Sequence, residues 1–384
     1  MRDPIGLYIH IPWCIKKCPY CDFNSHEFEA ESAQGLPHAL AEHYVDQLLK
    51  DFQSDLHLFD LHPNISSIFI GGGTPSLIPA QSLSRLLESI DQEVQLSSDV
   101  EITLEANPNS ADRARLQGYR QAGVNRLSLG IQSFNDQHLN LLGRLHDGQE
   151  AQIAVDAARR AGFENLNLDL MYGLPTQTLD DALADLDAAL GLAPEHISWY
   201  QLTIEPNTLF YRRRPALPSD AAISEVSDAG IARLTEAGFE RYEVSAFATQ
   251  GHQSRHNRTY WQFGDYLGIG AGAHGKVSSN GRIWRTQKTR VPKDYLTEPK
   301  RQYAEVERTE LPLEFLLNAL RLREGFMLAQ FESRTGLSSE VLEPTLTECE
   351  QLGLLTLMGT QVKPTDWGYD RLDSILERFA MRTP

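Results

Sequence analysis

Residues 8–23 read YIHIPWCIKKCPYCDF and hold three of the four cysteines of this 384-residue chain. Cys14, Cys18 and Cys21 form the pattern C-x3-C-x2-C, directly after a short apolar run that we predict to be a strand. A loop that follows a strand can bring three thiolates around one centre, and soft thiolates select iron–sulfur clusters or zinc. The cysteine stretch therefore predicts a metal centre at the end of the first strand.

The residues around the cysteines leave the kind of centre open. Zinc would require a fourth ligand, for which His10 and His26 are available. A four-iron cluster could accept three protein thiolates and leave one iron open to a substrate. Inert, buried thiols are the third alternative for the trio, and core burial is what we expect for the isolated Cys349.

The chain around this stretch repeats one pattern from residue 1 to about 240: a short apolar run, a polar or glycine-containing loop, then a longer helical pattern. The predicted strands are residues 6–11, 65–70, 100–104, 125–131, 165–170 and 196–204. This alternation predicts parallel pairing, in a doubly wound sheet or a full or partial barrel. In NLNLDLMYGLP (165–175), Asn167 and Asp169 alternate with leucines, which suits a barrel lumen better than a flat sheet.

Two further regions follow this 1–240 barrel. Residues 241–310 read as an irregular connecting and site-building region of turns and short strands, rich in glycine, histidine and aromatic residues. Residues 311–384 show helical patterns and a β-wing around 354–368, which together predict a small winged-helix-like α+β domain. That domain carries seven basic and eleven acidic residues, so we do not expect it to bind DNA.

The charge of the whole chain excludes some partners. It has 35 lysines and arginines against 52 aspartates and glutamates, a net charge of −17, and a net anion is repelled by nucleic acid and by anionic membranes. No apolar run reaches the ~18 residues of a membrane-spanning helix and no secretory signal is evident, so we expect a cytoplasmic protein. A reducing cytosol disfavours disulfides, which favours metal binding or chemistry for clustered cysteines.

Several motifs in combination resemble one superfamily. They are YIHIPWCIKKCPYCDF, GGGTPS (71–76), LEANP (104–108), LSLGIQS (127–133) and LDLMYGLP (168–175), each at the C-terminal end of a different predicted strand, where barrel enzymes assemble their sites. The set resembles the radical SAM superfamily, in the branch that contains oxygen-independent coproporphyrinogen III oxidase and HemW-type heme chaperones. The resemblance implies a partial (β/α)6 barrel in which Cys14, Cys18 and Cys21 ligate a [4Fe-4S] cluster and S-adenosylmethionine (SAM) takes the fourth iron.

The same resemblance implies roles for residues beyond the cysteines. Tyr8, Gly72 and Glu105 would contact this SAM molecule, and glycine suits such a contact because a Cβ would block the approach of a ligand to the backbone. In the oxidase a second SAM lies beside the first, and the matching positions here are Gly73, Thr74, Gln132, Arg144 and Asp169. The family chemistry is reductive cleavage of SAM to a 5′-deoxyadenosyl radical, which requires no side chain as acid or base, so we name no catalytic residue.

Two departures separate the chaperone from the oxidase. The oxidase has a fourth cysteine two positions after the third, where this chain has Phe23, and an N-terminal extension that is absent before Tyr8. In their place, HNRTYW (256–261) resembles a stretch of HemW-type proteins that is associated with heme, with His256 as iron ligand and Tyr260 and Trp261 against the macrocycle. His252 and His274 are the rival ligands.

We therefore expect a heme chaperone that uses a [4Fe-4S] cluster and SAM and delivers heme to acceptor hemoproteins, with coproporphyrinogen III oxidation as the alternative function. The expected partners are heme, acceptor hemoproteins and an electron donor, with a homodimer as an option and no nucleic acid. Two basic stretches, RIWRTQKTRVPK (282–293) and YRRRP (211–215), could receive heme propionates or an acidic partner, or could simply be solvated.

Overall fold

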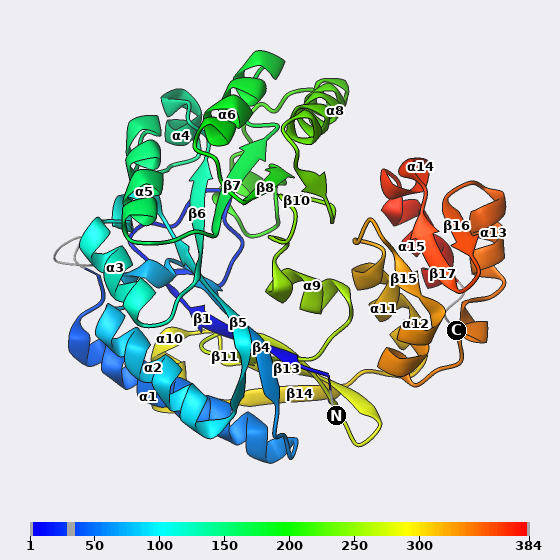
Figure 1. The fold of residues 1–384 in the computed structure, drawn as a ribbon, viewed down its shortest axis with the longest axis horizontal. Coiled ribbons are helices and arrows are strands. Elements are labelled where there is room, and N and C mark those ends of the chain that lie inside the picture. Colours follow the sequence, from blue (N-terminus) through cyan, green and yellow to red (C-terminus); the bar gives the residue numbers. More distant parts are fainter. Residues whose placement is uncertain (1–2, 29–34, 382–384) are drawn as a thin grey trace.

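The computed structural model describes residues 3–28 and 35–381, and its centre is a sheet in which six parallel strands follow one another in sequence order (Figure 1). These strands are β1 (Ile5–Ile11), β4 (Asn64–Gly72), β5 (Gln95–Ala106), β6 (Arg126–Gln132), β7 (Leu166–Tyr172) and β8 (His196–Gln201). Each strand pairs in parallel with the next, for example Leu7 with Ile68 and Leu104 with Leu127. All six predicted strands are confirmed, and the sheet is a partial (β/α)6 barrel.

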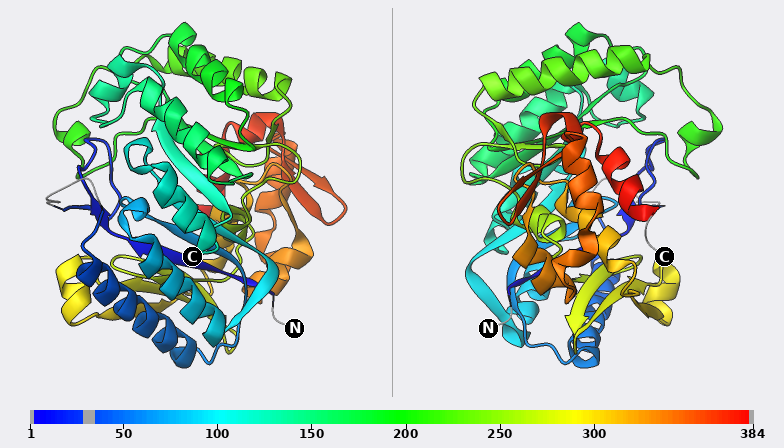
Figure 2. Two further views of the ribbon diagram at one scale, coloured as in Figure 1. Left: turned by 60° about the vertical axis from the view of Figure 1, so that its left-hand side comes forward. Right: turned by 90° about the vertical axis from the view of Figure 1, so that its right-hand side faces the viewer.

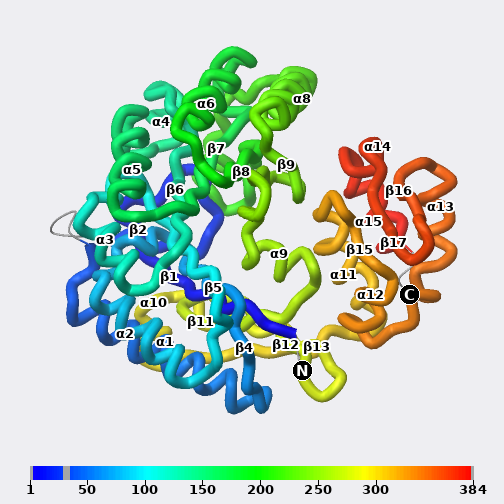
Figure 3. The backbone as a smooth tube through the Cα atoms, in the orientation of Figure 1, coloured from blue at the N-terminus to red at the C-terminus, as the bar shows by residue number. Residues whose placement is uncertain are grey.

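Helices connect these strands and cover the outer face of the sheet (Figures 1 and 3). They are α1 (His38–Leu58), α2 (Ala80–Glu93), α3 (Arg113–Gln121), α4 (Asp136–Leu141), α5 (Gly148–Arg160), α6 (Leu179–Gly191) and α8 (Asp220–Glu236). Helix α2 buries Leu83, Leu86, Leu87 and Ile90, which recur at helical spacing on one face. Capping boxes fix the starts of α5 and α6, so the sequence itself sets where each crossover helix begins.

The barrel is open, and residues 240–305 add one parallel and five antiparallel strands to the edges of its sheet. Strands β10 (Ala246–Ala248) and β9 (Glu240–Arg241) extend the β8 edge, whereas β11 (Tyr266–Ile269), β12 (His274–Ser279), β13 (Arg282–Lys288) and β14 (Arg301–Glu305) extend the β1 edge. The turns and short strands expected for residues 241–310 are present, and the strands join the barrel sheet. Main-chain pairing with the barrel edge stabilises these strands, and that pairing leaves little trace in the sequence pattern.

The C-terminal unit has its own hydrophobic core and lies to one side of the barrel (Figure 1). It contains α11 (Leu311–Ala319), β15 (Phe326–Met327), α12 (Leu328–Thr335), α13 (Thr345–Gln351), β16 (Leu355–Met358), β17 (Gln361–Pro364), α14 (Asp366–Tyr369) and α15 (Leu372–Ala380). Its sheet has the order β15-β17-β16, and β16 and β17 form the predicted wing. Cys349 is fully buried in this core, as expected.

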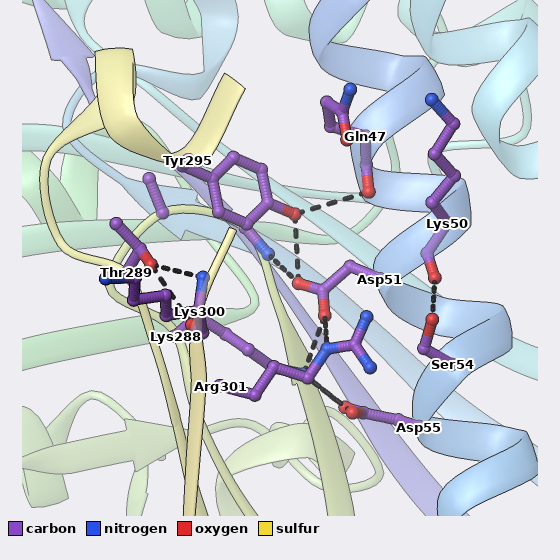
Figure 4. A network of polar contacts seen from close by, with 12 residues as sticks. Gln47, Lys50, Asp51, Ser54, Asp55, Lys288, Thr289, Tyr295, Lys300 and Arg301 are labelled. Atoms are coloured by element: carbon purple, nitrogen blue, oxygen red, sulfur yellow. Dashed lines mark hydrogen bonds and ion pairs between the residues drawn. The ribbon is translucent and has the colours of Figure 1, made fainter. Parts of the chain in front are cut away.

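A buried group of charges joins the β13–β14 extension to α1 (Figure 4). The Lys288 ammonium, 1% exposed, donates to Asp51 Oδ1 at 2.7 Å and to Asp55 Oδ2 at 2.6 Å. Arg301 and Tyr295 also donate to Asp51, whose second oxygen accepts the Gly270 N–H. This network holds the turn after β11 against the barrel, next to the loop that carries the cysteines.

Candidate functional site

The cysteine loop leaves β1 and is closed by main-chain hydrogen bonds. Short strands β2 (Trp13–Cys14) and β3 (His26–Glu27) pair in parallel and bring the two ends of the loop together. Within it the Cys21 N–H donates to the Cys18 carbonyl at 3.1 Å, which turns the chain so that all three cysteines line one hollow. None of the cysteines forms a disulfide.

Two residues that the sequence analysis did not single out fix the shape of this loop. Lys17 Nζ donates to the carbonyls of Phe23 and Ser25 at 3.0 and 3.2 Å and so ties the middle of the loop to its end. Asn24 Nδ2 donates to the carbonyls of Ala271 and Arg290, both at 2.9 Å, and anchors the loop to the β11–β14 extension. Nothing in the local sequence pattern signals these contacts.

The hollow lies at the C-terminal ends of the parallel strands and contains about 750 Å³ of empty space, part of it open to solvent. Of the residues predicted for the cluster and the cofactor, ten line it: Cys14, Cys18, Cys21, Gly72, Gly73, Thr74, Glu105, Gln132, Arg144 and Asp169. They come from five loops or strand ends that are far apart in the sequence. The structure therefore brings together nearly the whole predicted set.

At the GGGTP turn, the cysteine loop and His10 occupy the space that a side chain on Gly72 or Gly73 would need. An ideal Cβ on Gly73 would lie 2.6 Å from the Trp13 carbonyl oxygen and 3.0 Å from Cys14 Sγ. Gly72 has a φ of +121°, and its Cβ would meet the ring of His10 at 2.7 Å. The cysteine loop can approach the barrel this closely only because glycine stands at both positions.

Two partly buried carboxyl groups, those of Glu105 and Asp169, project into the hollow from β5 and β7. Burial raises the pKa of Glu105 to about 8, and the neighbouring charge of Asp169 adds to this; Glu105 also accepts the Gly72 N–H at 3.1 Å. Burial likewise raises the pKa of Asp169, although Asn167 and Ser128 donate hydrogen bonds to it. Such groups suit a ligand that offers hydroxyls or an ammonium, which would replace the water lost on burial.

Other hydrogen bonds orient the remaining polar groups of the hollow. Arg144 donates to Cys18 Sγ at 3.6 Å and, through its other terminal nitrogen, to Asn107 Oδ1 and the Gly130 carbonyl, both at 2.6 Å. Thr74 donates to Cys14 Sγ, and Tyr200 donates to Gln132 Oε1 at 2.8 Å. Asn107 and Tyr200 were not predicted as site residues, although Asn107 directly follows β5 and Tyr200 is the penultimate residue of β8.

Tyr8, on β1, is not among the residues that line the hollow. Its hydroxyl shares a hydrogen bond with His10 Nδ1 at 2.9 Å, and His10 Nε2 contacts the Asn24 carbonyl at 2.9 Å. His26, the second histidine considered as a zinc ligand, contacts Asn24 Oδ1 at 3.2 Å. Across residues 3–28 and 35–381, no group of three or more His, Cys, Asp or Glu side chains is arranged to hold a single metal ion.

His256 lies away from the hollow, on α9 (Arg255–Trp261), and is 1% exposed. Both ring nitrogens are engaged: Nδ1 with Ser67 Oγ at 3.0 Å and Nε2 with the Tyr260 hydroxyl at 2.7 Å. Burial lowers the pKa of this imidazole to about 3. The structure therefore does not group His256 with the other predicted cofactor-binding residues.

The aromatic residues of HNRTYW line a second pocket, between α9, the β11–β13 strands and α11. Tyr260 and Trp261 share it with Lys276 and Arg285, which are paired with Asp265 and Glu314 respectively. Of the rival histidines, His252 contacts Thr249 Oγ1 at 3.0 Å, whereas His274 is exposed.

Among the helices that the structure describes, none combines the length and the hydrophobicity that crossing a membrane requires.

Comparison with known proteins agrees with this architecture. Residues 8–189 match the model of the radical SAM superfamily, and residues 306–370 match the HemN C-terminal domain. The heme chaperone HemW of Escherichia coli (strain K12) is 46% identical over 381 residues, 98% of each chain, and that of Haemophilus influenzae (strain ATCC 51907 / DSM 11121 / KW20 / Rd) is 45% identical with the same coverage.

Among solved structures, the coproporphyrinogen III oxidase HemN of Escherichia coli, a radical SAM enzyme, superimposes with a TM-score of 0.80. That alignment covers 98% of this chain and 90% of HemN at 24% identity, and it shows a shared fold. The identity with the curated relatives extends over both the barrel and the C-terminal unit. The chain therefore belongs to the radical SAM superfamily and, within it, to the family of HemW heme chaperones.

Proposed function

We propose that this protein binds a [4Fe-4S] cluster, SAM and heme, and that it delivers heme to acceptor hemoproteins. The observation that carries the proposal is the hollow in which Cys14, Cys18 and Cys21 meet Glu105, Asp169 and the GGGTP turn. The names of the relatives, heme chaperone HemW, supply the heme part of the proposal.

The residues of the hollow fit a cluster and SAM. The three thiols line one hollow of about 750 Å³, and no histidine among the described residues lines it with them, which suits a cluster held by three protein thiolates. Gly73 lets the cysteine loop lie against the GGGTP turn, and the carboxyl of Glu105 in the hollow suits a ligand that offers a hydroxyl or an ammonium.

When bound, the cluster and SAM would supply one-electron chemistry, and the side chains of the chain would position them. Cys14, Cys18 and Cys21 would hold the cluster, while Arg144 and Thr74, through their contacts with Cys18 and Cys14, would orient the thiolates. The remaining members of the predicted set are Tyr8, Gly72, Gly73, Glu105, Gln132 and Asp169, and we propose that those lining the hollow contact SAM. Tyr8 would act through His10.

For heme, we propose the pocket that Tyr260 and Trp261 line, because aromatic faces suit the macrocycle. Lys276 and Arg285 also line it, and a propionate would have to displace Asp265 or Glu314 to pair with them. Ligation of the iron by His256 stays a prediction. It would require the hydrogen bond to Tyr260 to break. Heme titration of His256→Ala tests it, and an unchanged affinity would remove His256 from the heme site.

The proposed function is tested by heme transfer. Protein reconstituted without oxygen is loaded with heme and mixed with an apo-hemoprotein, with Cys18→Ser protein as the cluster-free control. We expect the Soret band of the acceptor to appear with the intact protein and to be reduced with the variant. Absence of transfer from the loaded protein would contradict the proposal.

The alternative function predicts a different product. Coproporphyrinogen III, a reductant and SAM would yield protoporphyrinogen IX if the chain were an oxidase. At the position of the oxidase's fourth cysteine, Phe23 is 63% exposed at the mouth of the hollow. We expect no protoporphyrinogen IX, and its formation would overturn the assignment as a chaperone alone.

A further inference from the structure

We propose that an exposed surface beside the cysteine loop docks an acidic one-electron carrier protein, which reduces the cluster. This inference rests on the proposed function, because it assumes that a cluster is present. We call this surface the rim patch and define it by Lys16, Leu145, Leu209, Tyr211 and Arg212–Arg214, all of which are exposed.

The rim patch is attached directly to the loop that carries the cysteines. Helix α7 (Leu209–Arg212) protrudes at the mouth of the barrel and lies beside the cysteine loop in both views of Figure 2. The Phe210 N–H donates to the Pro19 carbonyl at 2.9 Å, and the Phe210 ring lies 6.4 Å from that of Tyr20. Because Pro19 follows Cys18 in the chain, a protein docked on α7 would lie close to the cluster ligands.

In the described part of the chain, the arginine side chains of the rim patch are not paired with acidic residues. The side chains of Arg212–Arg214 make no hydrogen bond and no ion pair with any residue in 3–28 or 35–381, and the sequence has no acidic residue between Glu205 and Asp220. In a chain with a net charge of −17, such a run is a local source of positive potential that steers an anionic partner.

In the other basic stretch, residues 282–293, most of the cations are paired with acidic side chains. Within residues 282–293, Arg282 pairs with Glu305, Arg285 pairs with Glu314, and Lys288 is buried against two aspartates. Acids from distant parts of the chain thus neutralise three of its five cations. Charge complementarity therefore favours the rim patch over residues 282–293 as the surface for an acidic protein.

Exposed apolar side chains accompany the arginines. Leu209, Tyr211 and Leu145 are 51%, 54% and 50% exposed, and Leu145 lines a small hollow together with Lys16 and Cys18. Arginine and tyrosine are among the residue types that most often dominate protein–protein binding energy. A protruding helix cannot enclose a heme, so its occupant is a protein surface, and its place beside the cysteines favours an electron carrier over a heme acceptor.

The proposed step balances as a single electron transfer. The carrier is oxidised by one electron, the cluster is reduced by one electron, and neither a bond nor a proton changes place. Docking at the rim patch would shorten the distance between the two redox centres, while electrostatic steering would raise the rate at which the proteins meet.

The test measures binding and reduction separately. The probe is a plant-type [2Fe-2S] ferredoxin, an acidic one-electron carrier, labelled with a dye so that binding is measured whether or not the chaperone holds a cluster. The variant combines Arg212→Ser, Arg213→Ser and Arg214→Ser. The matched control combines Lys50→Ser, Lys300→Ser and Lys363→Ser, which removes the same number of positive charges. These lysine side chains are likewise unpaired in the described structure, and they lie outside the rim patch. A triple Arg→Lys variant preserves the charge.

We expect the arginine variant to bind ferredoxin at least about tenfold more slowly at low ionic strength and to lose most of the salt dependence of binding. The lysine control and the Arg→Lys variant should bind like the natural protein, and dithionite should reduce all four proteins equally. Unchanged ferredoxin binding by the arginine variant, or an equal loss in the lysine control, would overturn the proposal. Purified protein without iron and sulfide would contradict the proposed function instead, and ferredoxin binding would still decide the docking surface.

Discussion

Replacing Gly73 by alanine should weaken the hold of the cysteine loop on its cluster. The added Cβ would lie 2.6 Å from the Trp13 carbonyl oxygen, whereas ordinary contacts begin at 3.4 Å, so the two must separate by about 0.8 Å. The obstacle is backbone and cannot rotate away. Trp13 is also buried against Tyr44, with ring centroids 4.7 Å apart, which limits its movement.

The expected magnitude follows from these contacts. The Trp13 carbonyl accepts the Thr74 N–H at 2.8 Å, so a displaced carbonyl also weakens this hydrogen bond, worth about 0.5–1.5 kcal/mol. Overpacking of this kind costs about 1–3 kcal/mol in total. If that cost falls on the form that holds the cluster, it weakens cluster retention by about 5- to 140-fold.

The assay is competition for iron. Gly73→Ala and natural protein are reconstituted without oxygen and titrated with an iron chelator, and bound iron and sulfide are measured. Gly191→Ala is the matched control, because Gly191 is exposed at the end of α6 and an added Cβ would meet nothing within 4 Å. We expect the chelator to strip Gly73→Ala at a lower concentration than the other two proteins. Equal retention in all three would refute the argument from close approach.

Three further predictions concern ligation, burial and pH. Cys18→Ser should abolish cluster loading, which iron and sulfide analysis would show, and normal loading would remove Cys18 from the ligand set. Lys288→Met should lower the free energy of unfolding by about 3–5 kcal/mol, because it leaves Asp51 and Asp55 buried with too little counter-charge. The control is Arg282→Met, which should cost about 1 kcal/mol or less because Arg282 and Glu305 form an exposed pair. Similar urea midpoints for the two variants would contradict this prediction. Burial raises the pKa of Asp185 from 3.8 to about 6, so between these pH values the folded state keeps a proton that the unfolded chain loses. The contribution of Asp185 to the free energy of unfolding should therefore fall by about 3 kcal/mol as the pH rises from about 4 to 6. Asp185→Asn should flatten that part of the pH profile of unfolding, and a profile parallel to that of the natural protein would count against it.

Strands and site residues that follow from the local pattern of the sequence could be predicted from it. The six parallel strands are short runs in which apolar residues recur, in some of them alternating with polar residues that face the barrel interior, and such runs are visible in one sequence. The cluster cysteines, Glu105 and Asp169 stand at the ends of these strands, so the order of the strands already places them at one mouth.

Residues that act through distant contacts could not be predicted. Asn24 anchors the cysteine loop to carbonyls about 250 positions further along the chain, and the partners of Arg282, Arg285 and Lys288 come from other elements. The orientation of His256 depends on which face of α9 turns toward β4, where Ser67 lies. Side-chain type suggested a ligand at this position, but the packing of α9 engages both ring nitrogens.

The decisive measurement is the electron paramagnetic resonance spectrum of the reduced protein, recorded with and without SAM, alongside analysis of its metal content. We expect about four iron atoms and four sulfides per chain, and a cluster signal that changes when SAM is added, because three cysteines leave one iron open. Zinc in place of iron, or a cluster signal that SAM leaves unchanged, would contradict the site proposed at Cys14, Cys18 and Cys21.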